Sequence, residues 1–132
     1  MARVLIADDS IMMRKTLREI LTKSGHTVVA EAADGVEACR EFDLHQPDLV
    51  TLDIYMPIMS GMDALREILS RHPHARIIIV SSEGGSSMIC QALKSGAKSY
   101  VIKPFFIHSL VDTVNKILQY DSTVQRDTIY NV

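Results

Sequence analysis

The stretch Val4-Leu5-Ile6-Ala7-Asp8-Asp9-Ser10 decides the fold, because an apolar run ends abruptly in two carboxylates and a hydroxyl. Three later apolar runs also end in polar or charged groups: Leu49–Leu52 before Asp53, Ile77–Val80 before Ser81 and Ser82, and Tyr100–Ile102 before Lys103. Continuous apolar runs of this length are typical of strands in a parallel sheet that is covered on both faces. Parallel strands all end at one edge, where such sheets bind ligands, so these polar groups should converge there.

Helix-length segments separate the runs, so the sequence predicts an α/β fold in which strands and helices alternate. The expected strands lie at about residues 4–7, 27–32, 49–52, 77–80 and 100–102. The expected helices lie at about 10–24, 34–45, 62–69, a short segment ending near 95, and 107–118. We expect Val36, Cys39 and Phe42 to face the core, and Ile107 to belong to the apolar stripe of the last helix. Residues 1–120 should form one domain, and residues 121–132 a frayed or flexible C-terminal tail.

Composition and charge exclude several classes of function. The formal charge is −2 at pH 7 and the basic residues are scattered, which argues against nucleic-acid binding through phosphate neutralisation. No apolar stretch approaches the roughly 18 residues of a membrane span, and no signal-peptide pattern is present, so we expect a cytoplasmic protein with no membrane insertion. Neither the cysteines nor the histidines show metal-ligand spacing. Cys39 and Cys90 should be buried apolar residues, and the histidines solvated residues of loops and helix ends.

Three carboxylates at one edge of a sheet need compensating positive charge. Two unit charges about 4 Å apart repel by about 4 kcal/mol at an effective dielectric constant of about 20, so an uncompensated cluster would oppose folding. Lys103 offsets one charge, and the remainder calls for a hard divalent cation, Mg²⁺ or Mn²⁺. Asp8 and Asp9 taken alone have a second interpretation, as turn and helix-cap residues. The polar groups at the other strand ends favour the site.

The complete set of strand-end motifs resembles the receiver domain of two-component response regulators. The matching motifs are Asp8-Asp9-Ser10, Asp53-Ile54-Tyr55-Met56-Pro57 with Gly61, Ser81-Ser82, Gly96-Ala97 and Lys103-Pro104-Phe105, and the resemblance covers about residues 3–120. Each motif is weak alone, but their order, spacing and common position make the set specific. The resemblance implies a doubly wound, flavodoxin-like (βα)5 fold with a five-stranded parallel sheet of order 2-1-3-4-5.

The resemblance also implies a role for each polar residue of the site. Asp53 would be the phosphoacceptor, which receives a phosphoryl group from a histidine kinase or phosphotransfer protein. Mg²⁺ would be bound by Asp9 and Asp53 directly, by Asp8 through water and by the backbone carbonyl of Tyr55, while Lys103 and Ser81 would hold phosphoryl oxygens. Phosphoryl transfer depends mostly on alignment and charge neutralisation, which a metal and a lysine supply. The chain would be a signalling domain with self-phosphorylation and slow autodephosphorylation, not an enzyme.

Ser81 and Tyr100 are the expected switch residues. Once Asp53 is phosphorylated, Ser81 would draw its loop inward and Tyr100 would turn toward the vacated space. A downstream protein would then bind the face formed by the fourth helix, fifth strand and fifth helix. Ser81 stands where threonine is commoner in the family, which keeps the hydroxyl but loses a methyl group. Tyr100 has a second interpretation as an ordinary half-buried strand aromatic, since aromatic residues favour strands.

Two further expectations concern the loops around Asp53. Tyr55 and Glu83 are candidate modulators of the hydrolysis rate, because each lies two residues after a group of the site; the alternative is that either is a solvated loop side chain. The Lys103–Pro104 peptide bond is expected to be cis, since Lys103 must point into the site while the chain turns into the last helix.

Two other folds or activities fit the pattern less well. A flavodoxin relative shares the fold, but Asp8 and Asp9 would repel a bare phosphate. An aspartate phosphatase would have a second acid two residues after its nucleophile, and Tyr55 stands there instead. The sequence most resembles a stand-alone regulator of the chemotaxis type. The alternative is a receiver fragment of a larger regulator with a DNA-binding or enzymatic output domain.

Overall fold

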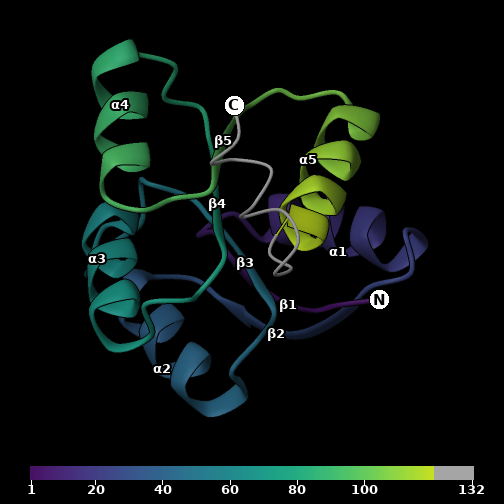
Figure 1. Cartoon of the computed structure of the whole chain (residues 1–132), viewed down its shortest axis with the longest axis horizontal. Helices are drawn as coiled ribbons and strands as arrows, with labels where there is room; N and C mark the ends of the chain where they lie inside the picture. Colours follow the sequence, from purple (N-terminus) through teal and green to yellow (C-terminus); the bar gives the residue numbers. More distant parts are fainter. Residues whose placement is uncertain (121–132) are drawn as a thin grey trace, which may run out of the picture.

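A parallel sheet runs through the centre of the computed structural model, which describes residues 1–120 (Figure 1). Its strands are β1 (Arg3–Ala7), β2 (Thr27–Ala32), β3 (Leu49–Leu52), β4 (Ile77–Ser81) and β5 (Ser99–Ile102). The helices are α1 (Ile11–Lys23), α2 (Gly35–His45), α3 (Gly61–Arg71), α4 (Ser86–Lys94) and α5 (Ile107–Tyr120). The strands are all parallel and lie in the order β2-β1-β3-β4-β5, which confirms the predicted fold class and strand order.

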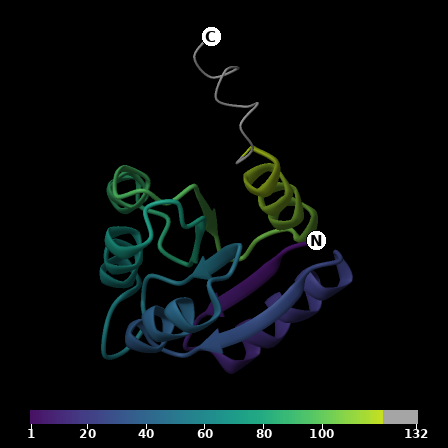
Figure 2. The ribbon, with the colours of Figure 1, turned by 60° about the horizontal axis from the view of Figure 1, so that its bottom comes forward.

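Helices cover both faces of the sheet, with α1 and α5 on one side and α2, α3 and α4 on the other (Figures 1 and 2). Successive strand residues point to opposite faces. On β1, Leu5 and Ala7 therefore belong to the cluster beneath α2 and α3, while Val4 and Ile6 belong to the cluster beneath α1 and α5. This arrangement explains why apolar residues stand at consecutive positions of the central strands and not only at alternate ones.

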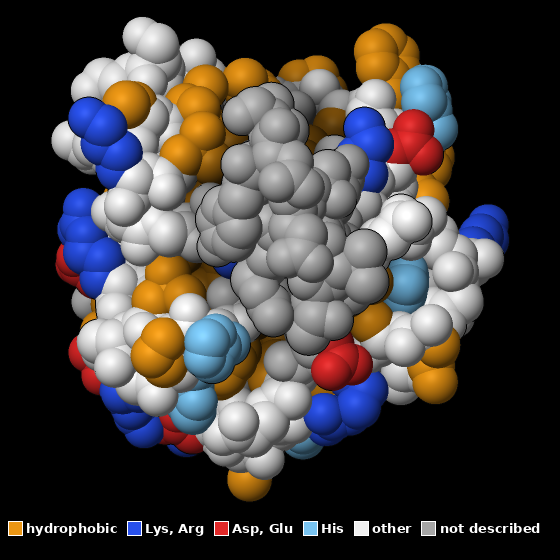
Figure 3. Space-filling model, viewed as in Figure 1, with side chains coloured by type: hydrophobic (Ala, Val, Ile, Leu, Met, Phe, Trp, Pro, Cys, Tyr) orange, Lys and Arg blue, Asp and Glu red, His pale blue; other side chains and the backbone are white. Residues whose placement is uncertain are grey.

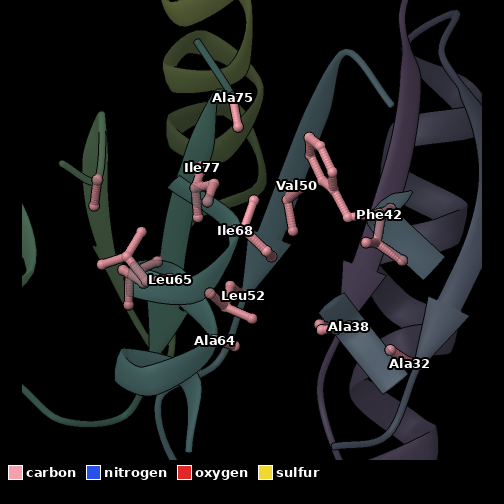
Figure 4. Packing of buried hydrophobic residues seen from close by; sticks show 14 of the residues in the cluster. Ala32, Ala38, Phe42, Val50, Leu52, Ala64, Leu65, Ile68, Ala75 and Ile77 are labelled. Carbon is pink, nitrogen blue, oxygen red and sulfur yellow. The ribbon is translucent and has the colours of Figure 1, made fainter. Parts of the chain in front are cut away.

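Figure 4 shows the core on the α2 and α3 side of the sheet. Phe42 of α2 and Leu65 and Ile68 of α3 point toward strand residues that include Val50 and Ile77, and all are buried. Burying one large apolar side chain contributes about 1.5 to 3 kcal/mol, so this cluster is a main source of stability. It also fixes the end of β3 at the point where the chain leaves the sheet.

Three of the helices begin with a side chain that caps the exposed backbone. Ser10, Asp34 and Ser60 accept the backbone N–H of the third residue beyond them at the starts of α1, α2 and α3. Such a cap contributes about 1 kcal/mol. α4 differs, because it follows Gly85 with no side-chain cap. Of the nine residues of α4, all within the described chain, only Ala92 is buried, so α4 is held less firmly than its neighbours.

Four residues differ from their predicted environments. Val36 is 42% exposed, because α2 turns Ala38 and Phe42 toward the sheet and Val36 lies away from that stripe. Ile107 is exposed at the first position of α5. Cys90 is exposed on α4. Cys39 packs against the core, as predicted, but is only half-buried, and this burial raises the pKa of its thiol.

His26 was expected in solvent but is buried, and its Nδ1 accepts the backbone N–H of Ala2. It joins the beginnings of β1 and β2, which places it at the opposite end of the strands from their polar carboxyl ends. The predicted tail, residues 121–132, lies outside the described residues. Among the described residues, no helix has the length and apolar character needed to cross a membrane.

Candidate functional site: an acidic cluster at the carboxyl edge of the sheet

Three aspartates meet where β1 and β3 end. Carboxylate oxygens of Asp8, Asp9 and Asp53 all lie within 4.8 Å of one another. Asp8 and Asp53 are 1% and 7% exposed, whereas Asp9 is exposed at the mouth of the cluster. The convergence expected from the sequence is therefore present, because adjacent parallel strands bring their carboxyl ends to one place.

Lys103, just beyond β5, supplies the positive charge of the cluster. Its Nζ lies 2.7 Å from Oδ2 of Asp8 and 3.2 Å from Oδ2 of Asp53. Burial would lower the pKa of Lys103, but the hydrogen bond to Asp8 and the charge of Asp53 outweigh it and leave that pKa above its usual value. Lys103 is therefore fully protonated at neutral pH. The peptide bond between Lys103 and Pro104 is cis.

The cluster fits a divalent cation better than it fits a bare anion. Three carboxylates against one ammonium leave a formal excess of two negative charges among the four groups. Carboxylate oxygens are the ligands that hard cations such as Mg²⁺ prefer. Asp9 is exposed while Asp8 and Asp53 are buried, so the cluster borders solvent on the side of Asp9.

The loop after β3 holds Asp53 in a close backbone contact. The N–H of Gly61 donates to the carbonyl of Ile54 at 2.7 Å. A Cβ atom on Gly61 would lie 1.9 Å from the carbonyl oxygen of Asp53, so only glycine fits at this position. The N–H of Tyr55 also donates to Oδ1 of Asp53, at 3.4 Å. The loop thus fixes both the backbone and the carboxylate of Asp53.

Ser81 and Tyr100 are connected through Glu83. Ser81 is fully buried, and its hydroxyl accepts the N–H of Glu83 at 3.3 Å. The Tyr100 hydroxyl donates to the carbonyl of Glu83 at 2.6 Å. Burial raises the pKa of Tyr100, while the nearby Ser81 hydroxyl acts in the opposite direction. The two predicted switch residues, at the end of β4 and on β5, therefore both bond to Glu83 in the loop after β4.

Tyr55 and Glu83 are in direct contact, which sequence reasoning had not predicted. The Tyr55 hydroxyl donates to Oε1 of Glu83 at 2.6 Å, and the N–H of Gly85 donates to Oε2 at 3.0 Å. The hydrogen bond raises the pKa of the Tyr55 phenol and lowers the pKa of Glu83. The two residues were singled out separately, each for its spacing from a strand end. Their contact joins the loops after β3 and β4.

Arg14 is a second feature of the site that the sequence analysis missed. Its Nη1 donates to the backbone carbonyl of Asp8 at 2.7 Å, and its Nε lies 2.9 Å from Oε1 of Glu31. The sequence signal that could have pointed to Arg14 was Glu31, the charged residue of β2. A charged residue in a covered strand calls for a partner, and helical spacing places Arg14 and Arg18 of α1 on one face to supply it.

This fold and this arrangement of carboxylates, hydroxyl and lysine define a receiver domain. The family model described as the response regulator receiver domain matches residues 4–115, and the chain belongs to that family. Among individual relatives, the chemotaxis protein CheY of Thermotoga maritima is 44% identical over 115 residues, covering 87% of this chain and 96% of the relative. The chemotaxis protein CheY of Bacillus subtilis is 45% identical over 116 residues, covering 88% and 97%.

A solved structure shows the same fold. The CheX–CheY–BeF₃–Mg²⁺ complex from Borrelia burgdorferi matches with a TM-score of 0.85 and 36% identity, covering 87% of each chain. The chain is thus a CheY-like receiver domain, which is a signalling domain and not a classical enzyme. Receiver domains bind Mg²⁺ at an acidic pocket, and CheY-like domains interact with kinases and with downstream targets.

Proposed function

We propose that this chain is a phosphorylation-activated switch, in which Asp53 accepts a phosphoryl group from a histidine kinase or phosphotransfer protein in a Mg²⁺-dependent reaction. The observation that carries the proposal is the buried carboxylate of Asp53, which lies among two other aspartates and within 3.2 Å of the Lys103 ammonium. An aspartate in that position has both a source of charge neutralisation and a fixed orientation.

The reaction requires Asp53 to act as the nucleophile. A carboxylate oxygen of Asp53 would attack the phosphorus of a phosphohistidine, and the O–P bond would form as the P–N bond to the donor imidazole breaks, leaving the bonding electrons on that nitrogen. Lys103 would hold a phosphoryl oxygen, and Ser81 would donate its hydroxyl hydrogen to another. Asp9, Asp53, the carbonyl of Tyr55 and, through water, Asp8 would hold Mg²⁺, whose charge offsets that of the carboxylates and phosphoryl group.

The output would be read on the face formed by α4, β5 and α5. Figure 3 shows hydrophobic side chains near α4 and at the beginning of α5 on this side of the molecule. Among the described side chains of these elements and of the segment before α5, the large exposed apolar residues are Leu93, Ile102, Phe106 and Ile107. Tyr100 lies on β5 and reaches Glu83 before α4, so a movement of the loop after β4 would change this face. Exposed apolar side chains suit a protein partner.

A stand-alone role of the chemotaxis type is supported by the similarity to chemotaxis proteins over nearly their whole lengths. The proposed partners are therefore a phosphodonor at the acidic cluster and a target protein at the α4–β5–α5 face. The test is incubation of the full chain with acetyl phosphate, with and without Mg²⁺, followed by measurement of intact mass. We expect one phosphoryl group per chain, added only when Mg²⁺ is present. Equal modification in excess chelator would contradict the proposal.

Replacing Ser81 by alanine should separate phosphorylation from output. Ser81→Ala should still be modified at Asp53, since Lys103 and the metal ligands remain. It should lose most of the phosphorylation-dependent gain in partner affinity, a coupling that is typically worth about 1 to 3 kcal/mol. A target protein is first obtained by pull-down with the phosphorylated chain. The measurement is the Kd of each variant for that target, with and without beryllofluoride as a phosphoryl mimic. Tyr100→Ala should behave similarly.

The matched control for this experiment is Ser82→Ala, which removes a hydroxyl from the exposed neighbouring residue. It should keep the full gain in affinity. If Ser81→Ala and Tyr100→Ala also keep the full gain, the coupling does not run through these two residues.

Truncating Tyr55 should shorten the lifetime of the phosphoryl group. The Tyr55 backbone N–H bonds to Asp53 and its phenol is held by Glu83, so the ring should hinder the attacking water. We expect Tyr55→Ala to increase the rate of dephosphorylation about threefold, which corresponds to about 0.6 kcal/mol of activation free energy. Tyr55→Phe, which keeps the ring, should lie closer to wild type. A half-life of Tyr55→Ala equal to or longer than that of wild type would count against shielding.

A further inference from the structure

Asp8 is held by partners on every side. Its Oδ2 accepts a hydrogen bond from Lys103 at 2.7 Å and its Oδ1 accepts the N–H of Ser10 at 2.9 Å. Its backbone N–H donates to the carbonyl of Ala32 at 2.9 Å. The remaining group is the backbone carbonyl, which accepts Nη1 of Arg14 at 2.7 Å. Arg14 thus completes the set of contacts around the most buried carboxylate of the acidic cluster.

The carbonyl of Asp8 also belongs to the backbone that leads into Asp9. The carbonyl of Asp8 and the N–H of Asp9 belong to one planar peptide group, so a hydrogen bond to the carbonyl restricts rotation of the whole plane. The Asp9 side chain extends from the residue after this plane and contributes the exposed carboxylate of the cluster. A group that restricts the plane therefore restricts the backbone from which that carboxylate extends.

Arg14 is itself anchored. Its Nε lies 2.9 Å from Oε1 of Glu31, while Oε2 of Glu31 lies 2.7 Å from Nε of Arg18. Burial raises the pKa of Glu31, but hydrogen bonds from Arg18 and Arg14 outweigh it and leave that pKa below its usual value. Glu31 is next to Ala32, whose carbonyl accepts the N–H of Asp8, so β2 supports the acidic loop directly and through Arg14.

We infer that Arg14, anchored by Glu31, is a positioning residue for the Mg²⁺ site of Asp8, Asp9 and Asp53. This inference rests on the proposed function, because it assumes that the acidic cluster binds Mg²⁺. Groups that orient metal ligands typically contribute 10- to 100-fold to metal affinity. Arg14 acts through the backbone of Asp8 and not by contact with the ion.

Arg18 provides a matched control, since it pairs with the same carboxylate of Glu31 but donates to no residue of the acidic cluster in the described part of the chain. We expect Arg14→Met to raise the Kd for Mg²⁺ about tenfold. Arg18→Met should leave it within about twofold of wild type, because exposed ion pairs contribute little. The measurement is calorimetric titration of the full chain with MgCl₂ alone, accompanied by thermal unfolding without Mg²⁺. The Asp9 amide resonance should shift in Arg14→Met and stay near its wild-type position in Arg18→Met.

Two further variants keep the test decisive if Arg14→Met does not fold. Arg14→Lys keeps one donor for either the carbonyl or Glu31 and should give an intermediate Kd. Glu31→Gln leaves the contact with Asp8 but removes the anchoring charge, and should raise the Kd about threefold. Equal Mg²⁺ affinities in the Arg14 and Arg18 variants, with wild-type affinity in Glu31→Gln, would overturn the role of Arg14. Failure of the wild-type chain to bind Mg²⁺ would instead overturn the proposed metal site and the inference with it.

Discussion

Asp53→Asn is expected to abolish phosphorylation by acetyl phosphate. The amide has nearly the shape of the carboxylate, so the loop after β3 should be preserved, but its oxygen is a poor nucleophile and carries no negative charge. The effect should be at least about 100-fold on the modified fraction, since no other group takes over the covalent step. Intact mass after incubation with acetyl phosphate and Mg²⁺ measures it directly.

The control for this variant is Asp112→Asn, which removes a carboxylate from an exposed position on α5. Asp112→Asn should be modified to the wild-type extent. Thermal unfolding of both variants shows whether the fold is retained. If Asp53→Asn still gains the mass of one phosphoryl group, another residue is the phosphoacceptor and the proposed function is wrong.

Gly61→Ala should be the most destabilising of the substitutions considered, although it adds a single methyl group. That methyl carbon would lie 1.9 Å from the carbonyl oxygen of Asp53, so the backbone of β3 or of α3 must move. Overpacking of this kind costs about 3 kcal/mol, which corresponds to a fall in Tm of about 10 °C. Because the displaced atoms belong to Asp53, we also expect slower phosphorylation. Thermal unfolding and the acetyl phosphate assay measure the two effects separately.

Gly84→Ala is the matched control, because it adds the same methyl group at an exposed glycine. There the added carbon would lie 3.6 Å from the side chain of Ile102, an ordinary van der Waals contact. The Tm of Gly84→Ala should stay within about 2 °C of wild type. Equal stability of Gly61→Ala and wild type would show that the loop after β3 has more room than the structure indicates.

Much of the fold could be predicted from the sequence because its main signals are local. The apolar runs of β1, β3 and β4 are continuous, and the structure places these strands in the middle of the sheet with helices on both faces. The residue-level errors concern the directions of side chains. Val36 points away from the buried stripe of α2, and Ile107 is exposed at the first position of α5. His26 is polar, but its Nδ1 finds a partner in the backbone N–H of Ala2, just before β1.

The composition of the acidic cluster was predictable for a similar reason. Asp8, Asp53 and Lys103 each follow a strand directly, and the parallel arrangement brings strand ends together wherever the helices lie. The supporting contacts were not predictable, because they depend on side-chain directions across elements. Arg14 reaches back from α1 to the carbonyl of Asp8, and Tyr55 reaches across to Glu83. Tyr55 and Glu83 are 28 residues apart in sequence, whereas Arg14 and Asp8 are only six apart but belong to a helix and to the loop before it. Neither pair has a spacing that marks it.

The light burial of α4 has a consequence for how the molecule opens. Only Ala92 of α4 is buried in the core, and the helix begins without a side-chain cap. Separation of α4 from the sheet therefore loses little stabilising free energy. Local opening of such an element takes less free energy than unfolding of the whole domain. The backbone amides of α4 should therefore exchange their hydrogens with solvent by partial opening, while those of β1 and β3 should exchange only through global unfolding. A lightly anchored helix thus begins in the loop that Ser81 and Tyr100 contact, where a small input of binding energy can shift the population of conformations.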